Sequence, residues 1–370
     1  MDYSTKILSR EWPYVVLAWV LLMYLYFFLT FWSLRDFLTE GVITEYSQSW
    51  AAHLEIVMAG LLFGLLFCVV DSITDTDSLR RRSLGFIILL KSSLYIVSWA
   101  VTMLSVYGVY VVFEVIPKST LDQLFALPPL YLVSLCTYLA LVIVLLNFIL
   151  QVSRKFGPGN LSGLIMGKYQ NPKEENRIFM FLDLQGSTTI AEKLGHVRYS
   201  RLLRECYHEL TDIVIRYNAD IYQYVGDEVV LSWRAHEGLS NLRCFRTFFD
   251  FEKKLHGRSE FYSRHYETVP EFKGGMDMGK VTVAEIGDIK REIAYHGDVL
   301  NTASRIQERC KDLDRRLLIS GRLERNLTTL NGFVKELVGT TKLRGKEKEV
   351  SIYSIEMERD SAQKHLSRIS

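Results

Sequence analysis

The sequence predicts two structural units in one chain: an N-terminal domain of four membrane-spanning helices, followed by an α+β domain with a ferredoxin-like core. Two observations support this. Residues up to about 150 are dominated by long apolar runs, whereas the remainder alternates strand-like and helical patterns with an ordinary share of charged residues. With 370 residues, the chain is long enough for two or three domains.

Four stretches are long and apolar enough to cross a bilayer, which requires roughly 20 mostly apolar residues per helix. They lie at about residues 13–34, 50–70, 84–113 and 127–150, within a membrane domain expected over 1–152. Buried globular helices rarely run uninterrupted this far, and the first stretch is too long and aromatic for a cleaved signal peptide. Lys91 lies near one end of the third stretch, so we expect its side chain to reach the headgroups.

Basic residues beside these stretches predict their orientation, because cytoplasmic flanks carry an excess of Lys and Arg. With four spans, most of these basic residues fall on the same side of the membrane, namely Lys6, Arg10, Arg80, Arg81, Arg82, Arg154 and Lys155. The other side has only Arg35 and Lys118. We therefore expect a multi-pass protein of the cell inner membrane, with the N-terminus and the C-terminal domain in the cytoplasm.

Charge and cysteine content argue against a nucleic-acid-binding protein and against a metal site built from cysteines. The chain has 44 basic and 42 acidic residues, so it lacks the basic excess of a nucleic-acid-binding protein. Its five cysteines are scattered and lack the spacing of a metal site. His53 and Glu55, near the outer end of the second stretch, either bind a signal or face water, and the sequence leaves both interpretations open.

The C-terminal domain alternates strands and helices in roughly a β-α-β-β-α-β order, which predicts an antiparallel ferredoxin-like core. Strands are expected at 177–183, 220–225, 228–233, 271–278 and 280–286, and helices at 188–217, 240–255 and 299–311. The segment 274–280 (GGMDMGK) superficially resembles a phosphate-binding loop. It lacks the Ser or Thr that follows the Lys of such loops and falls in an expected hairpin, so we reject that role.

Two acidic motifs follow strand-like runs in this domain. Asp183 lies in FLDLQGST (181–188), Asp227 lies in YVGDE (224–228), and NTASR (301–305) follows downstream. Carboxylates presented from neighbouring strand ends suit hard cations that carry a triphosphate. A lone Asp after a strand is more often a turn residue, so the ordered set of three motifs is what indicates a nucleotide site.

The sequences and order of these motifs resemble those of the class III adenylate and guanylate cyclases, and the resemblance covers about residues 160–356. The resemblance implies the class III cyclase fold for 177–356 and conversion of ATP to 3′,5′-cyclic AMP and pyrophosphate. It implies that Asp183 and Asp227 bind two divalent cations, Mg²⁺ or Mn²⁺, with help from the Leu184 carbonyl. It also implies that Asn301 orients the ribose while Arg305 neutralises charge growing on the α-phosphate.

Other positions are expected to hold the triphosphate. A helix that begins at residues 186–188 would offer the free backbone N–H groups of Gly186, Ser187 and Thr188 to phosphate oxygens. Arg344 stands where the family usually has a triphosphate-binding Lys and keeps the positive charge. In this family one protomer contributes the two aspartates and the other contributes the Asn, the Arg and the base-recognition residues. The resemblance therefore implies a homodimer with two shared sites and an inactive monomer.

The base-recognition positions depart from the family pattern. Gln223 stands where adenylate cyclases commonly have Lys, and Ala294 stands where they have Asp or Thr. A Gln amide both donates and accepts, so it is able to pair with adenine or, when flipped, with guanine. We favour ATP as substrate on the tendency of the family. A guanylate cyclase and a non-catalytic nucleotide-sensing membrane module are the alternatives.

Two segments flank the cyclase-like domain. Residues 153–176 form a linker with a plausible short helix at 160–169, which is either passive or a dimer-contacting transducer between membrane and catalytic domains. Residues 357–370 form a polar tail. A transporter or channel would be expected to show polar, Gly/Pro-broken spans in matching pairs, which the sequence lacks. The ligand or partner that regulates the membrane domain is not specified by the sequence.

The predicted topology is directly testable. A reporter fused after Arg154 should behave as cytoplasmic, and tags placed within 36–48 or 117–123 should be reachable from outside, because the basic residues hold the other side in the cytoplasm. Accessibility labelling of intact cells makes the measurement. Labelling of the segment 80–82 from outside would contradict the four-span arrangement.

Overall fold

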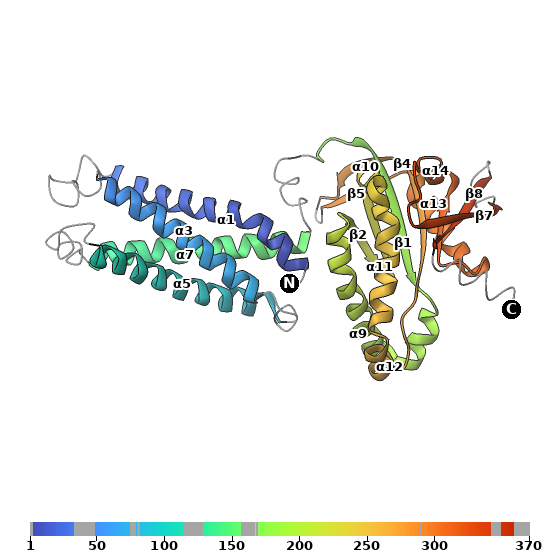
Figure 1. Ribbon diagram of the computed structural model, residues 1–370, viewed down its shortest axis with the longest axis horizontal. Helices are drawn as coiled ribbons and strands as arrows, with labels where there is room; N and C mark the ends of the chain where they lie inside the picture. Colours follow the sequence, from blue (N-terminus) through green and yellow to red (C-terminus); the bar gives the residue numbers. More distant parts are fainter. Residues whose placement is uncertain are drawn as a thin grey trace. The chain divides into compact units, whose positions relative to one another are not determined.

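Four long helices make up the N-terminal part of the computed structural model, which describes residues 3–32, 49–74, 79, 82–113, 129–156, 167, 169–288, 291–341 and 349–358 (Figure 1). The helices are α1 (Tyr3–Phe27, continued by the π-helix η1, Phe28–Trp32), α3 (Trp50–Thr74), α5 (Leu84–Val112) and α7 (Pro129–Phe156). Each contains a stretch long and apolar enough to cross a membrane, of 19, 25, 25 and 18 residues. This confirms the four predicted helices.

The four helices pack around an aromatic core. Trp19 of α1 meets Phe63 of α3 edge to face with ring centroids 4.5 Å apart, and Phe67 stacks on Tyr95 of α5 at 4.0 Å. Helices α1 and α3 approach closely because α3 has glycine at the contact. A Cβ on Gly60 would lie 2.8 Å from a backbone atom of Val20, so no larger residue fits there without a shift.

Lys91 does not extend to the headgroups, so that expectation is wrong. Its side chain is only 3% exposed and forms an ion pair with Asp71 of α3. Close by, the Asn147 amide of α7 donates to the Ser92 hydroxyl and to the Ile88 carbonyl, each at 3.1 Å. Because α3 lies against α5, the charge of Lys91 is neutralised inside the bundle, which avoids an isolated charge in an apolar medium.

The C-terminal unit contains a mixed sheet in the order β2-β3-β1-β4-β6-β8-β7, with β5 paired to β4. The strands are β1 (Lys173–Leu184), β2 (Asp220–Val225), β3 (Glu228–Arg234), β4 (Phe272–Ile286), β5 (Glu292–His296), β6 (Leu317–Ser320), β7 (Phe333–Thr341) and β8 (Val350–Met357). The helices are α9 (Ser187–Arg216), α10 (Ala235–Leu239), η3 (Ser240–Leu242), α11 (Arg243–Gly257), α12 (Ser259–Tyr266), α13 (Asp298–Asp312) and α14 (Gly321–Glu324).

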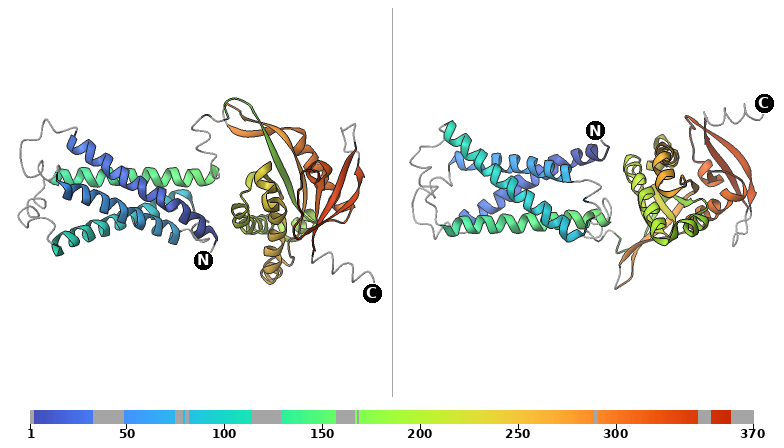
Figure 2. Two further views of the ribbon diagram at one scale, coloured as in Figure 1. Left: turned by 45° about the horizontal axis from the view of Figure 1, so that its top comes forward. Right: turned by 90° about the horizontal axis from the view of Figure 1, so that it is seen from below.

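The ferredoxin-like core is confirmed by the element order β1-α9-β2-β3-α11-β4 and by antiparallel pairing along β2-β3-β1-β4. Successive β1 side chains point to opposite faces. Ile178, Met180 and Leu182 join the core beneath α9 and α11, the helices coloured yellow-green to yellow on one side of the sheet in Figure 2. Phe179 and Phe181 join the core beneath α13.

The hairpin expected around 274–280 is absent from the described residues, because β4 runs without a break from Phe272 to Ile286. The partner of its second half is β5. The glycines of this segment serve packing. Gly274 leaves room for Leu317 and Phe248 on one face, and Gly275 leaves room for α13 on the other. A hairpin was expected here, whereas the three glycines of this segment let neighbouring elements approach a continuous strand.

Gly275 sets how closely α13 packs on the sheet. A Cβ there would lie 2.2 Å from the Gln307 backbone nitrogen and 2.5 Å from the Ala303 carbonyl oxygen. Backbone atoms have no alternative rotamer, so a methyl group at Gly275 must push α13 away from β4.

We predict that Gly275→Ala destabilises the catalytic domain by about 1–3 kcal/mol, the usual cost of overpacking. Thermal unfolding of the full chain, followed by tryptophan fluorescence, makes the measurement. Gly257→Ala is the matched control, because a Cβ at Gly257 meets nothing within 4 Å and should leave the transition unchanged. An equal effect of both variants would contradict the packing argument.

Candidate active site

Three carboxylates gather where β1 ends beside the β2–β3 turn. Asp183 is the penultimate residue of β1 and lies opposite Glu228 of β3 in the strand register. Asp227 lies in the two-residue turn, which Gly226 opens with a φ of 64°. Since β1 side chains alternate, Asp183 points to the same face as Phe179 and Phe181, the face covered by α13. The structure therefore brings Asp183 and Asp227 together as the sequence predicted.

The pKa values of these carboxyl groups reflect their crowding. Burial, reinforced by the charge of Asp227, raises the pKa of Asp183 to about 6, although donation from Gln307 and from the Leu184 N–H opposes the shift. Burial, followed by the charges of Asp183, Asp227 and Glu308, raises the pKa of Glu228 to about 7. Desolvation and mutual repulsion thus both disfavour the ionised forms of the carboxyl groups at this strand end.

This environment fits a divalent cation. Carboxylate oxygens are the ligands of Mg²⁺, which typically uses one or two carboxylates and completes its shell with substrate phosphates and water. The described residues include no group of three or more His, Cys, Asp or Glu side chains able to hold a metal alone. Asp183 and Asp227 lie within side-chain hydrogen-bonding reach of each other, and a bound cation would relieve their repulsion.

The start of α9 lies directly after Asp183. Gly186 caps the helix in a left-handed conformation (φ 70°, ψ 22°), and no side chain caps the helix start. The first N–H groups of the helix, including those of Ser187 and Thr188, therefore point outward next to the carboxylates, as an anion site requires. Burial, followed by the charge of Asp227, raises the pKa of Tyr199 to about 12, although the nearby Ser187 side chain opposes the shift.

Asn301 and Arg305 lie one helical turn apart on α13. Asn301 is exposed and Arg305 is half-buried, and neither side chain has a hydrogen-bond or ion-pair partner within the described ranges. Two residues after Arg305, the buried Gln307 side chain lies near Asp183, and it lowers the pKa of that carboxyl group. Because an α-helix turns by about 100° per residue, Arg305 and Gln307 point in nearly opposite directions. Within one chain, Arg305 therefore faces away from the carboxylates.

The two expected base-recognition residues lie on β2 and β5. Gln223 is exposed, beside a register shift of β2 against β3, whereas Ala294 is buried and pairs with Ala284. Their neighbours Tyr222 and Tyr295 meet edge to face with ring centroids 5.0 Å apart. Strands β2 and β5 are not adjacent in the sheet, so this contact is between the tyrosine side chains and does not bring Gln223 and Ala294 together. Arg344 lies outside the described residues.

Sequence reasoning missed two residues of this site. Gln307 follows NTASR by two positions and carries no recognisable signal, because its role depends on α13 lying against Gly275. Tyr199 is twelve residues from Ser187, and nothing in the sequence between them shows that they meet.

Comparison with known proteins identifies the domain. A family model described as the adenylate and guanylate cyclase catalytic domain matches residues 169–357, which is more than half of the chain. The chain belongs to this family. Dimers and catalysis with two metal ions are general features of its members.

Adenylate cyclase 2 of Rhizobium meliloti (strain 1021) is 32% identical to this cyclase chain over 208 residues, covering 56% of this chain and 57% of the relative. Adenylate cyclase 1 of the same organism is 26% identical over 183 residues, covering 48% and 27% respectively. The chain thus spans little more than half the length of the first relative. A bacterial light-regulated adenylyl cyclase shares the fold, with a TM-score of 0.50, 20% identity and coverage of 58% of this chain and 64% of that one.

Crowded carboxylates predict how the stability of this cyclase depends on pH and metal. The folded-state pKa values of Asp183 and Glu228 are raised, so without metal their contribution to stability is lost as the pH rises from about 4 to about 7. Divalent cations bind the ionised form. Mg²⁺ or Mn²⁺ should therefore raise the thermal midpoint of the full chain more at pH 8 than at pH 5.5.

Asp183→Asn is the matched variant for this measurement. It should raise the metal-free midpoint at pH 8, because one repelling charge is gone, and it should abolish most of the stabilisation by metal. A metal effect of the same size at both pH values, or one retained in the variant, would place the cation elsewhere.

Proposed function

We propose that this chain is a membrane-bound adenylate cyclase that converts ATP to 3′,5′-cyclic AMP and pyrophosphate in a homodimer. The ribose 3′-oxygen forms a bond to the α-phosphorus and loses its proton. The bond between the α-phosphorus and the bridging oxygen breaks, and pyrophosphate leaves with that oxygen. The 32% identity to an adenylate cyclase and the carboxylate pair at the end of β1 support this proposal.

Asp183 and Asp227, with the Leu184 carbonyl, are the groups we assign to hold two divalent cations, Mg²⁺ or Mn²⁺. When bound, such cations lower the pKa of the attacking hydroxyl and neutralise the leaving pyrophosphate. Burial keeps the carboxylates poorly solvated, which strengthens their attraction to a cation. Gln307 and the Leu184 N–H lie near the Asp183 carboxylate and favour its ionised form, which lowers its pKa against the effect of burial.

The remaining groups bind and orient the nucleotide. The backbone N–H groups of Gly186, Ser187 and Thr188 donate to phosphate oxygens at the start of α9. Arg344 contributes positive charge to the triphosphate. Asn301 orients the ribose by hydrogen bonding, and Arg305 stabilises the charge that develops on the α-phosphate during bond exchange.

One observation favours a site shared between two chains. Gln307 reaches Asp183 from the sheet-facing side of α13, and Arg305 points to the opposite side of the same helix. A single chain thus directs its metal ligands and its charge-stabilising residues in different directions. Two chains arranged so that each offers α13 to the carboxylates of the other would form two complete sites.

Mixing inactive variants tests the shared site. Asp183→Ala and Arg305→Ala should each abolish cyclic AMP formation, whereas mixed dimers should regain activity because one of their two sites has both intact halves. With random pairing, roughly half of the dimers are mixed and each carries one active site, so activity should reach about a quarter of the wild-type rate.

Asp183→Ala mixed with Asp227→Ala is the control, because both changes fall in the same half and no complete site forms. Cyclic AMP production from ATP makes the measurement, with heterodimers verified by two affinity tags. Mixed dimers that form but stay inactive would refute the arrangement in trans.

The base pocket should discriminate only modestly between ATP and GTP. Gln223 and Ala294 provide one neutral amide and no charged partner, so the pocket lacks a charged hydrogen bond worth roughly 1.5–3 kcal/mol. We expect kcat/KM for ATP to exceed that for GTP by about 10- to 100-fold.

Gln223→Lys combined with Ala294→Asp should widen this preference by restoring a donor and an acceptor for adenine. Gln223→Lys alone is the control for folding, because Gln223 is exposed whereas Ala294 is buried. A wild-type preference for GTP, or an active double variant without improved discrimination, would mean that other residues read the base.

The membrane domain is proposed to anchor and regulate the catalytic domain. We assign residues 1–152 to the membrane domain, 153–176 to a linker that transmits its state, 177–356 to the catalytic domain and 357–370 to a polar tail. Helix α7 extends to Phe156 and β1 begins at Lys173, so both elements reach into the proposed linker range. The N-terminus and the catalytic domain are placed in the cytoplasm, where ATP is available, and the protein is assigned to the cell inner membrane. The paired Lys91 and Asp71 are charged groups inside this domain, and such groups are often functional.

A further inference from the structure

A buried carboxylate lies beneath the first turn of α13. Asp277 belongs to β4, and its side chain is completely buried. It points to the same face of the sheet as Gly275 and Gly279, the face on which α13 packs. A buried charge of this kind is strongly unfavourable unless it is paired and hydrogen-bonded. The groups that satisfy Asp277 are therefore held firmly.

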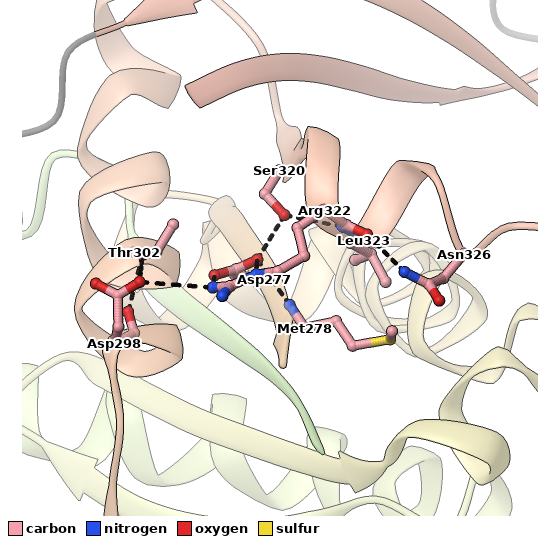
Figure 3. Close-up of polar contacts among 8 residues, drawn as sticks. All are labelled: Asp277, Met278, Asp298, Thr302, Ser320, Arg322, Leu323 and Asn326. Atoms are coloured by element: carbon pink, nitrogen blue, oxygen red, sulfur yellow. Dashed lines mark hydrogen bonds and ion pairs between the residues drawn. The ribbon is translucent and has the colours of Figure 1, made fainter. Parts of the chain in front are cut away.

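Four donors surround this carboxylate (Figure 3). The Met278 N–H donates at 2.8 Å, and the Ser320 hydroxyl donates to Oδ1. The Arg322 guanidinium spans both oxygens, with Nε 3.1 Å from Oδ1 and Nη2 bonded to Oδ2. Ser320 also caps α14 by accepting from the Leu323 N–H at 3.0 Å. The Arg322 guanidinium thus binds the Asp277 carboxylate in a bidentate manner, a geometry that Lys is unable to reproduce.

Arg322 also reaches α13. Its Nη2 lies 3.8 Å from Oδ2 of Asp298, the first residue of that helix. Thr302 bonds the Asp298 carbonyl at 2.8 Å and its carboxylate at 3.4 Å, which stiffens the same turn. The path between them is narrow, because a Cβ on Gly279 would lie 3.1 Å from Arg322 Nη1 and 3.0 Å from Val299. The guanidinium therefore bridges the sheet and the start of α13.

Asp298 shares a face of α13 with the residues proposed to act on the nucleotide. Asn301 and Arg305 follow it by three and seven positions, which places Arg305 within about 20° of Asp298 around the helix axis. A displacement of Asp298 would therefore rotate α13 about its axis and move Arg305 with it. The opposite face is already fixed by the contact of α13 with Gly275 and by Gln307.

We propose that Arg322 is a positioning residue of the cyclase reaction, which bridges Asp277 to Asp298 and thereby sets the orientation of Asn301 and Arg305. This inference rests on the proposed function. It assigns Arg322 to the half-site that contains Asn301 and Arg305, although Arg322 itself contacts no substrate. Small displacements of such groups are costly, because catalysis requires them in near-attack geometry.

Asp298→Asn is the mildest test, since it removes the charge that receives Arg322 and leaves the fork on Asp277 intact. We expect kcat to fall by about two- to fivefold, the range that a partly exposed ion pair supports. The KM for ATP and the metal concentration giving half-maximal rate should stay within about twofold, because the ground-state contacts of the other half-site are untouched. Asp312→Asn is the matched control: it removes one negative charge from the same helix, at an exposed pair with Arg309, and should leave kcat unchanged.

Arg322→Lys is the second variant, which keeps the charge and loses the fork. It should lower kcat as Asp298→Asn does, and combining the two changes should cost little more than either alone, because both break one bridge. An unchanged kcat in both variants, or strictly multiplicative losses, would overturn the proposal.

Mixed dimers separate positioning from general damage. Asp298→Asn paired with Asp183→Ala should regain one site of wild-type kcat, because that site draws its α13 from the Asp183→Ala chain. Asp298→Asn paired with Arg305→Ala should stay impaired. Recovery in the second mixture would assign the Arg322 bridge to the metal half and overturn the inference. Inactive wild-type protein, or Asp183→Ala and Arg305→Ala chains that fail to complement each other, would instead overturn the proposed function itself.

Discussion

The contact between α13 and β4 at Gly275 is the constraint on which the rest of the catalytic domain depends. Only a hydrogen atom fits between the two backbones there, so the depth and rotation of α13 are set by main-chain atoms. One face of the helix then directs Gln307 toward Asp183, and the opposite face directs Arg305 outward. Arg322 and Asp277 secure the start of the same helix. Gln307 and Arg305 thus lie on opposite faces of one helix, and the proposed sharing of the site between two chains rests on this geometry.

Electrostatics at the end of β1 places a second demand on the fold. Asp183 and Glu228 have raised pKa values because burial and neighbouring charges disfavour their ionised forms. The fold tolerates this crowding at the strand end, where the open start of α9 also provides N–H groups for anions. Ionisation of these buried carboxyl groups lowers the stability of the folded domain, and binding of cations and a triphosphate would restore it. The end of β1 thus combines crowded carboxylates with a helix start that no side chain caps.

The four long helices and the meeting of two strand ends were predictable, because each is encoded by a continuous stretch of sequence. Apolar runs identified the four long helices, and the motifs around Asp183 and Asp227 identified two strand ends that do meet. Features that depend on tertiary packing were missed. Lys91 pairs with Asp71 twenty residues away. A hairpin was expected at 274–280, whereas Gly274, Gly275 and Gly279 accommodate neighbouring elements along a continuous strand. Gln307 and the Arg322 bridge depend on the same packing, and no short pattern encodes them.

We propose that two copies of this chain are needed to turn ATP into a cyclic nucleotide. The most direct test is to separate monomer and dimer of the purified full chain and to quantify cyclic AMP and pyrophosphate formed from ATP with Mg²⁺ or Mn²⁺. We predict equimolar cyclic AMP and pyrophosphate from the dimer and none of either product from the monomer. Cyclic AMP from the isolated monomer, or ADP and phosphate in place of a cyclic product from the dimer, would contradict it.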